Sequence, residues 1–141
     1  MSVRKPNLIS LLLAGVLFSL SVNADDIRTE RLQFEAGTTG STIEASITGY
    51  DAVDYVVGAR AGQTIAVKLK TDNTANYFNV IPPDEEDAAV FIGSISGGEF
   101  TGPLELSGDW KIRVYLMRSA ARRNEVANFT LSVSVTGDAD R

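Results

Sequence analysis

Apolar and polar residues alternate along much of the chain, and this pattern constrains the fold more than any other feature of the sequence. In 127–136, apolar residues occupy every second position from Phe129 to Val135, with Thr or Ser between them. The segments 42–48 and 64–70 alternate in the same way. A period of two places successive side chains on opposite faces of a β-strand, so that one face is buried and the other meets solvent. The chain is therefore predicted to be all-β.

Turn-forming residues separate these runs at intervals of about ten residues, as is typical of all-β domains. They are Gly37, Gly40, Gly49, Gly62, Asp72-Asn73, Pro82-Pro83, Gly97-Gly98, Gly102-Pro103 and Ser107-Gly108. The predicted strands between them cover 27–34, 42–48, 54–59, 64–70, 77–81, 88–92, 99–106, 110–117 and 127–136. The segment 119–124 favours helix by composition, but it is too short for more than a turn. Short half-buried strands with this spacing indicate one β domain, either a sandwich or a small barrel.

A secretory signal peptide is predicted for residues 1–24. The segment begins with the basic residues Arg4 and Lys5, continues with an apolar run, and ends in a small-residue cleavage pattern at Ala24. The apolar run is shorter than the roughly 20 residues of a membrane-spanning helix, and an uncleaved anchor is the alternative interpretation. Cleavage after Ala24 leaves 25–141 as a single exported domain.

The chain contains no cysteine and no histidine, and this excludes several kinds of chemistry. Disulfides and a lipid-bearing N-terminal cysteine are impossible. So are Ser–His and Cys–His nucleophile pairs and the usual His- or Cys-based zinc sites. No catalytic constellation stands out in what remains, so the chain is predicted not to be an enzyme and to need no cofactor. The net charge of −5, which falls further when the signal peptide is removed, disfavours nucleic acid and anionic membranes as partners.

An acidic run, Asp84-Glu85-Glu86-Asp87, follows Pro82-Pro83. Its neighbours are loop-forming residues, which favours a solvated loop. A calcium site is the alternative, although the run lacks the alternating acidic spacing of calcium-binding loops.

The segment Ser107–Arg123 carries the strongest functional signal. Its strand places Ile112, Val114 and Leu116 on one face, and the strand then runs into a loop bearing three arginines, Arg118, Arg122 and Arg123. Arginine presents a planar, two-pronged set of donors that fits a carboxylate. Three arginines gathered at one strand end of an acidic chain therefore predict that this loop enters an acidic pocket on a partner.

The sequence SGDWKIRVYLMRSAARR at 107–123, preceded by GYDAVDY at 49–55 and AGQTIAVKL at 61–69, resembles the bacterial periplasmic inhibitors of goose-type (g-type) lysozyme. The resemblance extends over most of the mature chain, from about Phe34 to Val135. It implies an antiparallel β-sandwich of eight to nine short strands, located in the periplasm. It also implies a protein that blocks the glycan-binding cleft of a host or competitor muramidase.

The resemblance assigns an inhibitor interface to six residues. They are Tyr50, Ser107, Gly108, Trp110, Arg118 and Arg122, and Trp110 stands where the family has tyrosine. Other interpretations stay open for each group. The arginines could pair with surface acids such as Glu125. Trp110 could belong to the core. The role of Ser107 and Gly108 could be confined to shaping a turn.

A second function class also stays open at this point. The chain could be a non-inhibitory secreted β-sandwich that binds carbohydrate, calcium or another protein, with 84–87 as its site. The convergence of Tyr50, Arg118 and Arg122 on one edge, away from that acidic run, would favour the inhibitor.

Overall fold

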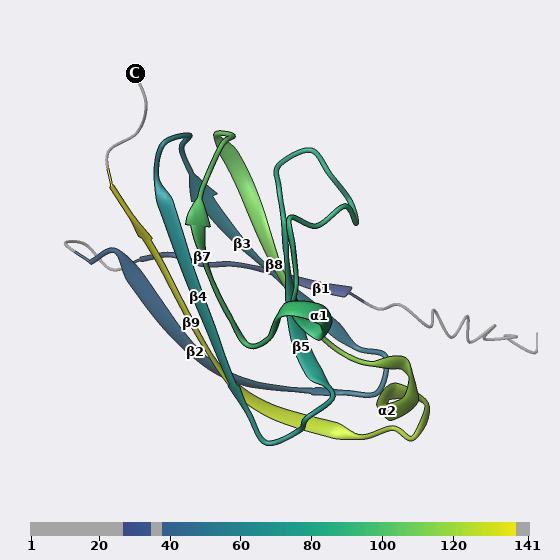
Figure 1. Cartoon of the computed structure of the whole chain (residues 1–141). Helices are drawn as coiled ribbons and strands as arrows, with labels where there is room; N and C mark the ends of the chain where they lie inside the picture. The colour runs from purple at the N-terminus through teal and green to yellow at the C-terminus, as the bar shows by residue number, and fades with distance from the viewer. Residues whose placement is uncertain (1–26, 35–37, 138–141) are drawn as a thin grey trace, which may run out of the picture.

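The chain folds into two β-sheets that pack face to face, as the computed structural model shows (Figure 1). The structure describes residues 27–34 and 38–137. One sheet has the strand order β1 (Ile27–Arg31), β3 (Ala52–Ala59), β8 (Gly108–Leu116), β5 (Asn76–Ile81) and β6 (Phe91–Ile92). The other has the order β2 (Gly40–Thr48), β9 (Val126–Thr136), β4 (Thr64–Thr71) and β7 (Glu99–Pro103). Two short helices, α1 (Gly93–Ser96) and α2 (Arg118–Arg122), lie in the connections.

The predicted β-sandwich is confirmed, and each of the nine predicted strands has a counterpart. The largest difference is at 88–92, where only Phe91–Ile92 forms a strand. The helix α1 follows at once and was not predicted, since four residues carry too little periodicity to signal a helix. The predicted helical turn at 119–124 is present one residue earlier, as α2.

The strand pairs in the described part of the chain are antiparallel, with the exception of β1 and β3. These two run parallel, with Ile27 opposite Ala52 and Arg31 opposite Val56. Parallel neighbours need a crossover connection, and here β2, which belongs to the other sheet, provides it. The five-stranded sheet is therefore mixed.

The core lies between the two sheets, and the period-two pattern correctly predicts its residues. In β8, Ile112 and Val114 have no exposed surface and Leu116 is also buried. Leu131 of β9 and Ile65 of β4 face them from the other sheet and are equally buried. The outward positions of β8 carry Lys111, Arg113 and Tyr115, as the alternation predicts.

The two ends of β8 define the two ends of the sandwich. The β7–β8 turn lies at the first end, and α2 lies at the second, directly after β8 (Figure 1). A strand of nine residues at about 3.3 Å per residue separates these ends by roughly 26 Å. Residues placed at opposite ends of β8 therefore cannot touch one another.

The predicted signal peptide lies outside the described residues. Within 27–34 and 38–137, no helix is long and apolar enough to cross a membrane.

Candidate functional site

The helix α2 presents two of the predicted arginines to solvent. Its middle residues, Ala120 and Ala121, are buried, and such small side chains allow the turn to press against the end of the core. Backbone bonds fix both ends of the segment: Met117 N donates to Ala75 O at 2.9 Å, and Glu125 N donates to Ala120 O at 3.1 Å. Arg118 and Arg122 are four residues apart, so they extend from the same side of the helix.

The turn between β2 and β3 brings Tyr50 to the same end. Gly49, at φ +60°, makes the turn, and its N–H donates to Glu125 O at 2.9 Å. This bond ties the turn to the segment that follows α2. Tyr50 stands next to it with 42% of its surface exposed. A turn that leaves one sheet and a helix that leaves the other thus meet at one edge.

Tyr50 and Arg118 line the same hollow on the outer face of the five-stranded sheet, with a volume of about 290 Å³. The residues around it are Ile27, Tyr50, Ala52, Asp87, Arg113, Tyr115, Leu116 and Arg118. The hollow therefore combines two tyrosines, two arginines and one carboxylate beside an apolar wall.

Arg118 and Arg122 have no ion-pair partner within 4 Å among the described residues. Glu125 pairs instead with Arg123, whose Nε donates to Glu125 Oε2 at 2.7 Å. A hydrogen bond from Asn73 and this contact with Arg123 hold the pKa of Glu125 below its usual range. Two of the three loop arginines are therefore exposed cations that can bind an acid on another molecule.

Two exposed apolar side chains flank this end and were not among the predicted site residues. Met117 precedes α2 and is 40% exposed, and Val126, opposite Thr48, is 50% exposed. The alternation predicted for 110–117 already placed Met117 on the outward face, and that signal could have identified it, whereas Val126 lies one residue before the predicted strand 127–136. Tyr50, Met117, Arg118, Arg122 and Val126 form what we call the α2 edge.

Ser107 and Gly108 lie at the opposite end of the sandwich. Ser107 Oγ accepts a hydrogen bond from Ala61 N at 2.8 Å, which joins the β7–β8 turn to the β3–β4 turn. Gly108 has φ +140°, and a Cβ at this position would come within 2.9 Å of Pro83. Both residues have clear roles in shaping the turn, and the structure does not bring them to the α2 edge.

Trp110 lies in the core, which is the alternative that the sequence left open for it. It is only 3% exposed, and its Nε1 donates to Leu106 O at 3.0 Å. Its position in β8 has the same parity as Ile112 and Val114, so the pleat turns the indole inward. The ring supports the β7–β8 turn from inside.

The acidic run 84–87 lies in the long loop between β5 and β6 and is bound to the sheet. Arg113 Nη1 donates to Asp87 Oδ1 at 2.8 Å, and Lys111 Nζ donates to Glu86 O at 3.4 Å. Among the described residues, no group of three or more His, Cys, Asp or Glu side chains is arranged to hold a metal ion.

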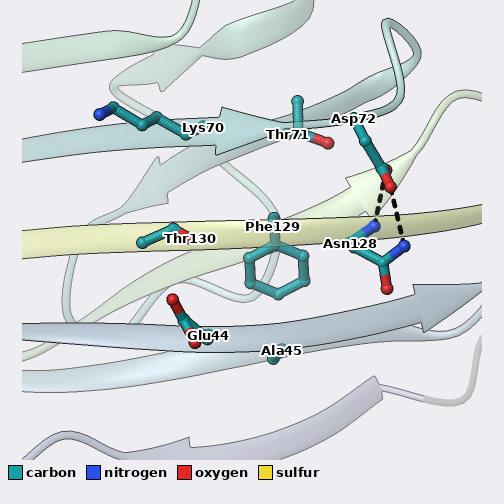
Figure 2. A pocket seen from close by; sticks show the side chains of 8 residues that line it. All are labelled: Glu44, Ala45, Lys70, Thr71, Asp72, Asn128, Phe129 and Thr130. Carbon is teal, nitrogen blue, oxygen red and sulfur yellow. Dashed lines mark hydrogen bonds between the residues drawn. The ribbon is translucent and has the colours of Figure 1, made fainter.

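A broader and more open hollow of about 520 Å³ lies on the outer face of the four-stranded sheet. Figure 2 shows Glu44, Thr130 and Lys70 in a row across β2, β9 and β4, and Asn128 bound to Asp72. Asn128 donates to Asp72 through Nδ2 and through its backbone N, each at 2.8 Å. The residues assigned to the inhibitor interface do not line this hollow.

No family model matches the chain. A crystal structure of Aeromonas hydrophila PliG, a periplasmic lysozyme inhibitor of g-type lysozyme, is 36% identical with a TM-score of 0.73, over 79% of this chain and 99% of that one. The inhibitor of g-type lysozyme from Escherichia coli is 25% identical over 95% of this chain and 96% of its own length. A crystal structure of Salmonella Typhimurium PliG, a periplasmic lysozyme inhibitor of g-type lysozyme, supports the fold. It is 22% identical to this chain, with a TM-score of 0.60, and the match covers 77% of this chain and 98% of that one.

Proposed function

Because the chain belongs to the family of periplasmic inhibitors of g-type lysozyme, we propose that it binds a lysozyme of this class and blocks its glycan-binding cleft with the α2 edge. On this proposal the protein is a binding partner and catalyses no reaction. The observation that carries the proposal is the convergence of Tyr50 and Arg118 on one hollow, with Arg122 on the same helix face.

The chemistry of the α2 edge suits a glycosidase cleft. Such a cleft contains carboxylates that hold the sugar and protonate the leaving oxygen. Arg118 and Arg122 are exposed and unpaired among the described residues, so they can form charge-assisted bonds with those carboxylates. Each guanidinium would occupy a polar position that the substrate needs. Inhibition then requires no covalent step.

Aromatic and sulfur-containing side chains add contact area around the two arginines. Tyr50 and Met117 are exposed beside them, and Tyr, Met and Arg are the residue types enriched at protein interfaces. Tyr50 has few rotatable bonds, so ordering it on binding costs little conformational entropy. We assign it to the site where a sugar ring would otherwise stack.

The Ser107-Gly108 turn has a supporting role in this proposal. Its hydrogen bond to Ala61 and its close packing on Pro83 set the start of β8 and of the β5–β6 loop. The contact surface that we propose therefore consists of Tyr50, Arg118 and Arg122, with Met117 and Val126 at its border.

The periplasm is the proposed location. It follows from the predicted signal peptide at 1–24 and from the relatives, which are described as periplasmic. The folded domain is then 25–141.

The test is a titration of purified 25–141 into g-type, chicken-type and invertebrate-type lysozymes acting on cell-wall substrate. We expect inhibition of the g-type enzyme at a lower concentration than of the other two. The Arg118→Ala/Arg122→Ala double variant should lose this inhibition, whereas Arg123→Ala is a matched control because Arg123 is already paired with Glu125. A wild-type protein that leaves g-type lysozyme fully active would refute the proposal.

A further inference from the structure

The ion pair between Arg113 and Asp54 lies at the centre of the five-stranded sheet, on its outer face. Arg113 Nε donates to Asp54 Oδ1 at 2.7 Å and Nη2 donates to Oδ2 at 2.9 Å, so the contact is two-pronged. The two side chains are only 16% and 7% exposed. Asp54 and Arg113 are also direct register partners in β3 and β8, which fixes the guanidinium in one position. Arg113 is therefore a rigid cation.

Arg113 uses its remaining donors on the acidic loop. Nη1 donates to Asp87 Oδ1 at 2.8 Å, and Nη2 donates to Glu86 O at 3.3 Å. The Asp87 side chain is 83% exposed. Among the described residues, its bond from Arg113 is the one that fixes the position of its carboxylate. One guanidinium thus binds a buried acid, Asp54, and an exposed acid, Asp87, at the same time.

Asp87 and Arg118 line the same hollow of about 290 Å³. Because both side chains line this one hollow, their opposite charges attract each other across it even when they are not in contact. An Asp87 side chain released from Arg113 would have Arg118 as an available cationic partner. Such a pair would neutralise a charge that the proposed function requires.

We propose that Arg113 is a positioning residue for inhibition: it holds the Asp87 carboxylate away from Arg118 and so keeps the Arg118 guanidinium free for an acid of the lysozyme. This inference rests on the proposed function of the α2 edge. Arg113 does not itself need to touch the lysozyme. It acts through the position of Asp87.

The test uses the double variant Asp54→Asn/Arg113→Gln, in which a neutral amide pair replaces the ion pair and no buried charge is left alone. Asp87 loses its anchor in this variant. We expect the inhibition constant for g-type lysozyme to rise about three- to fivefold at low salt, because an exposed ion pair with Arg118 must now be broken on binding. Adding Asp87→Asn should restore inhibition. Adding Asp84→Asn, a loop acid outside the hollow, should not.

A second measurement does not depend on the lysozyme. In the free protein, the Arg118 Nε–H signal in the nitrogen-15 NMR spectrum should shift, and its proton exchange should slow, in the double variant. Both changes should disappear when Asp87→Asn is added. If the NMR change is seen but the wild-type protein does not inhibit g-type lysozyme, the result counts against the proposed function and not against the Arg113 inference.

Three outcomes would overturn the inference itself. The first is a double variant that stays folded, shows no change at Arg118 and inhibits like wild type. The second is weakened inhibition that Asp87→Asn does not restore, which would mean that the ion pair acts only on the scaffold. The third is a large loss of inhibition from Asp87→Asn alone, which would make Asp87 a direct contact. If the double variant does not fold, the single variant Asp87→Glu decides: its longer side chain reaches toward Arg118, and it should weaken inhibition while Asp87→Asn does not.

Discussion

Gly49 and Asn124 approach so closely that a Cβ on Gly49 would lie 2.6 Å from Asn124 Oδ1. Both residues have positive φ, +60° and +56°. The hydrogen bond from Gly49 N to Glu125 O holds the β2–β3 turn, which carries Tyr50, against the segment that follows α2, and Asn124 leaves little room there for a side chain at position 49. The α2 edge therefore depends on a residue that has no side chain of its own.

Gly49→Ala tests this dependence. The alanine would have to adopt the left-handed backbone conformation of Gly49, and its Cβ would clash with Asn124 Oδ1. We therefore expect a loss of at least about 1 kcal/mol in the free energy of unfolding. Inhibition of g-type lysozyme should weaken as well, because Tyr50 moves with the turn. Urea denaturation and the lysozyme titration measure the two effects.

The matched control is Gly97→Ala, at a glycine that follows α1, has φ +107° and has open space around it, and is not part of the α2 edge. It should also lower stability but leave inhibition unchanged. Equal losses of inhibition in both variants would mean that the effect of Gly49 is only a stability effect.

Arg122→Lys should fail to replace Arg122, because a point charge cannot reproduce the two-pronged contact of a guanidinium with a carboxylate. Truncation of a desolvated charge pair costs about 2–5 kcal/mol, which is an increase of roughly thirtyfold or more in the inhibition constant for Arg122→Ala. The lysine variant should lie close to the alanine variant when both are titrated into g-type lysozyme. A lysine variant as active as wild type would show that charge alone is sufficient.

Thermal unfolding should distinguish a core residue from a residue of the proposed site, because only the core substitution should destabilise the domain. Val114→Asp places an unpaired charge at a position with no exposed surface, so the domain should not fold. Arg122→Ala removes an exposed cation, so the melting temperature should stay within about 2 °C of wild type. Circular dichroism measures both variants. A large fall in melting temperature for Arg122→Ala would make this arginine structural.

Acid should destabilise the protein in a window set by Asp72 and Glu125. Hydrogen bonds from Asn128 hold the pKa of Asp72 below its usual range, and those from Asn73 and Arg123 do the same for Glu125. A depressed pKa in the folded state contributes stability above the unfolded value, about 4, and that contribution is lost as the pH falls through the folded value. We therefore expect stability to be level from about pH 7 to pH 5 and to decline below pH 4.

Asn128→Ala is the specific check on this pH dependence. It removes the side-chain hydrogen bond to Asp72, so the pKa of Asp72 should rise toward its ordinary value while that of Glu125 stays low. An NMR titration of the side-chain carboxyl carbons reads both groups in one experiment. An unchanged pKa of Asp72 would contradict the stated cause.

Export should remove residues 1–24. The small-residue pattern at Ala24 predicts Asp25 as the mature N-terminus, with the protein in the periplasmic fraction. N-terminal sequencing of the fractionated protein measures this directly. Protein that keeps 1–24 and stays with the membrane would contradict it.

The sequence alone determined the strands and their faces, because alternation is a local property of each strand. It placed Ile112 and Val114 inward and Arg113 outward, and all three positions are confirmed. It also identified the arginine-bearing loop and placed Trp110 on the inward parity, although the family resemblance had assigned that residue to the interface.

Only the tertiary structure decided which of these residues meet. Tyr50 lies in the β2–β3 turn and Arg118 in α2, two connections that are distant in the sequence. Strand order and sheet packing, which no local pattern encodes, bring them to one hollow. The same packing sends Ser107 to the far end of β8. It also sets Arg113 between Asp54 and Asp87, a contact that depends on a cross-strand register and on the path of a long loop. Periodicity is local and fixes the face of each residue, whereas the packing of distant segments fixes its neighbours.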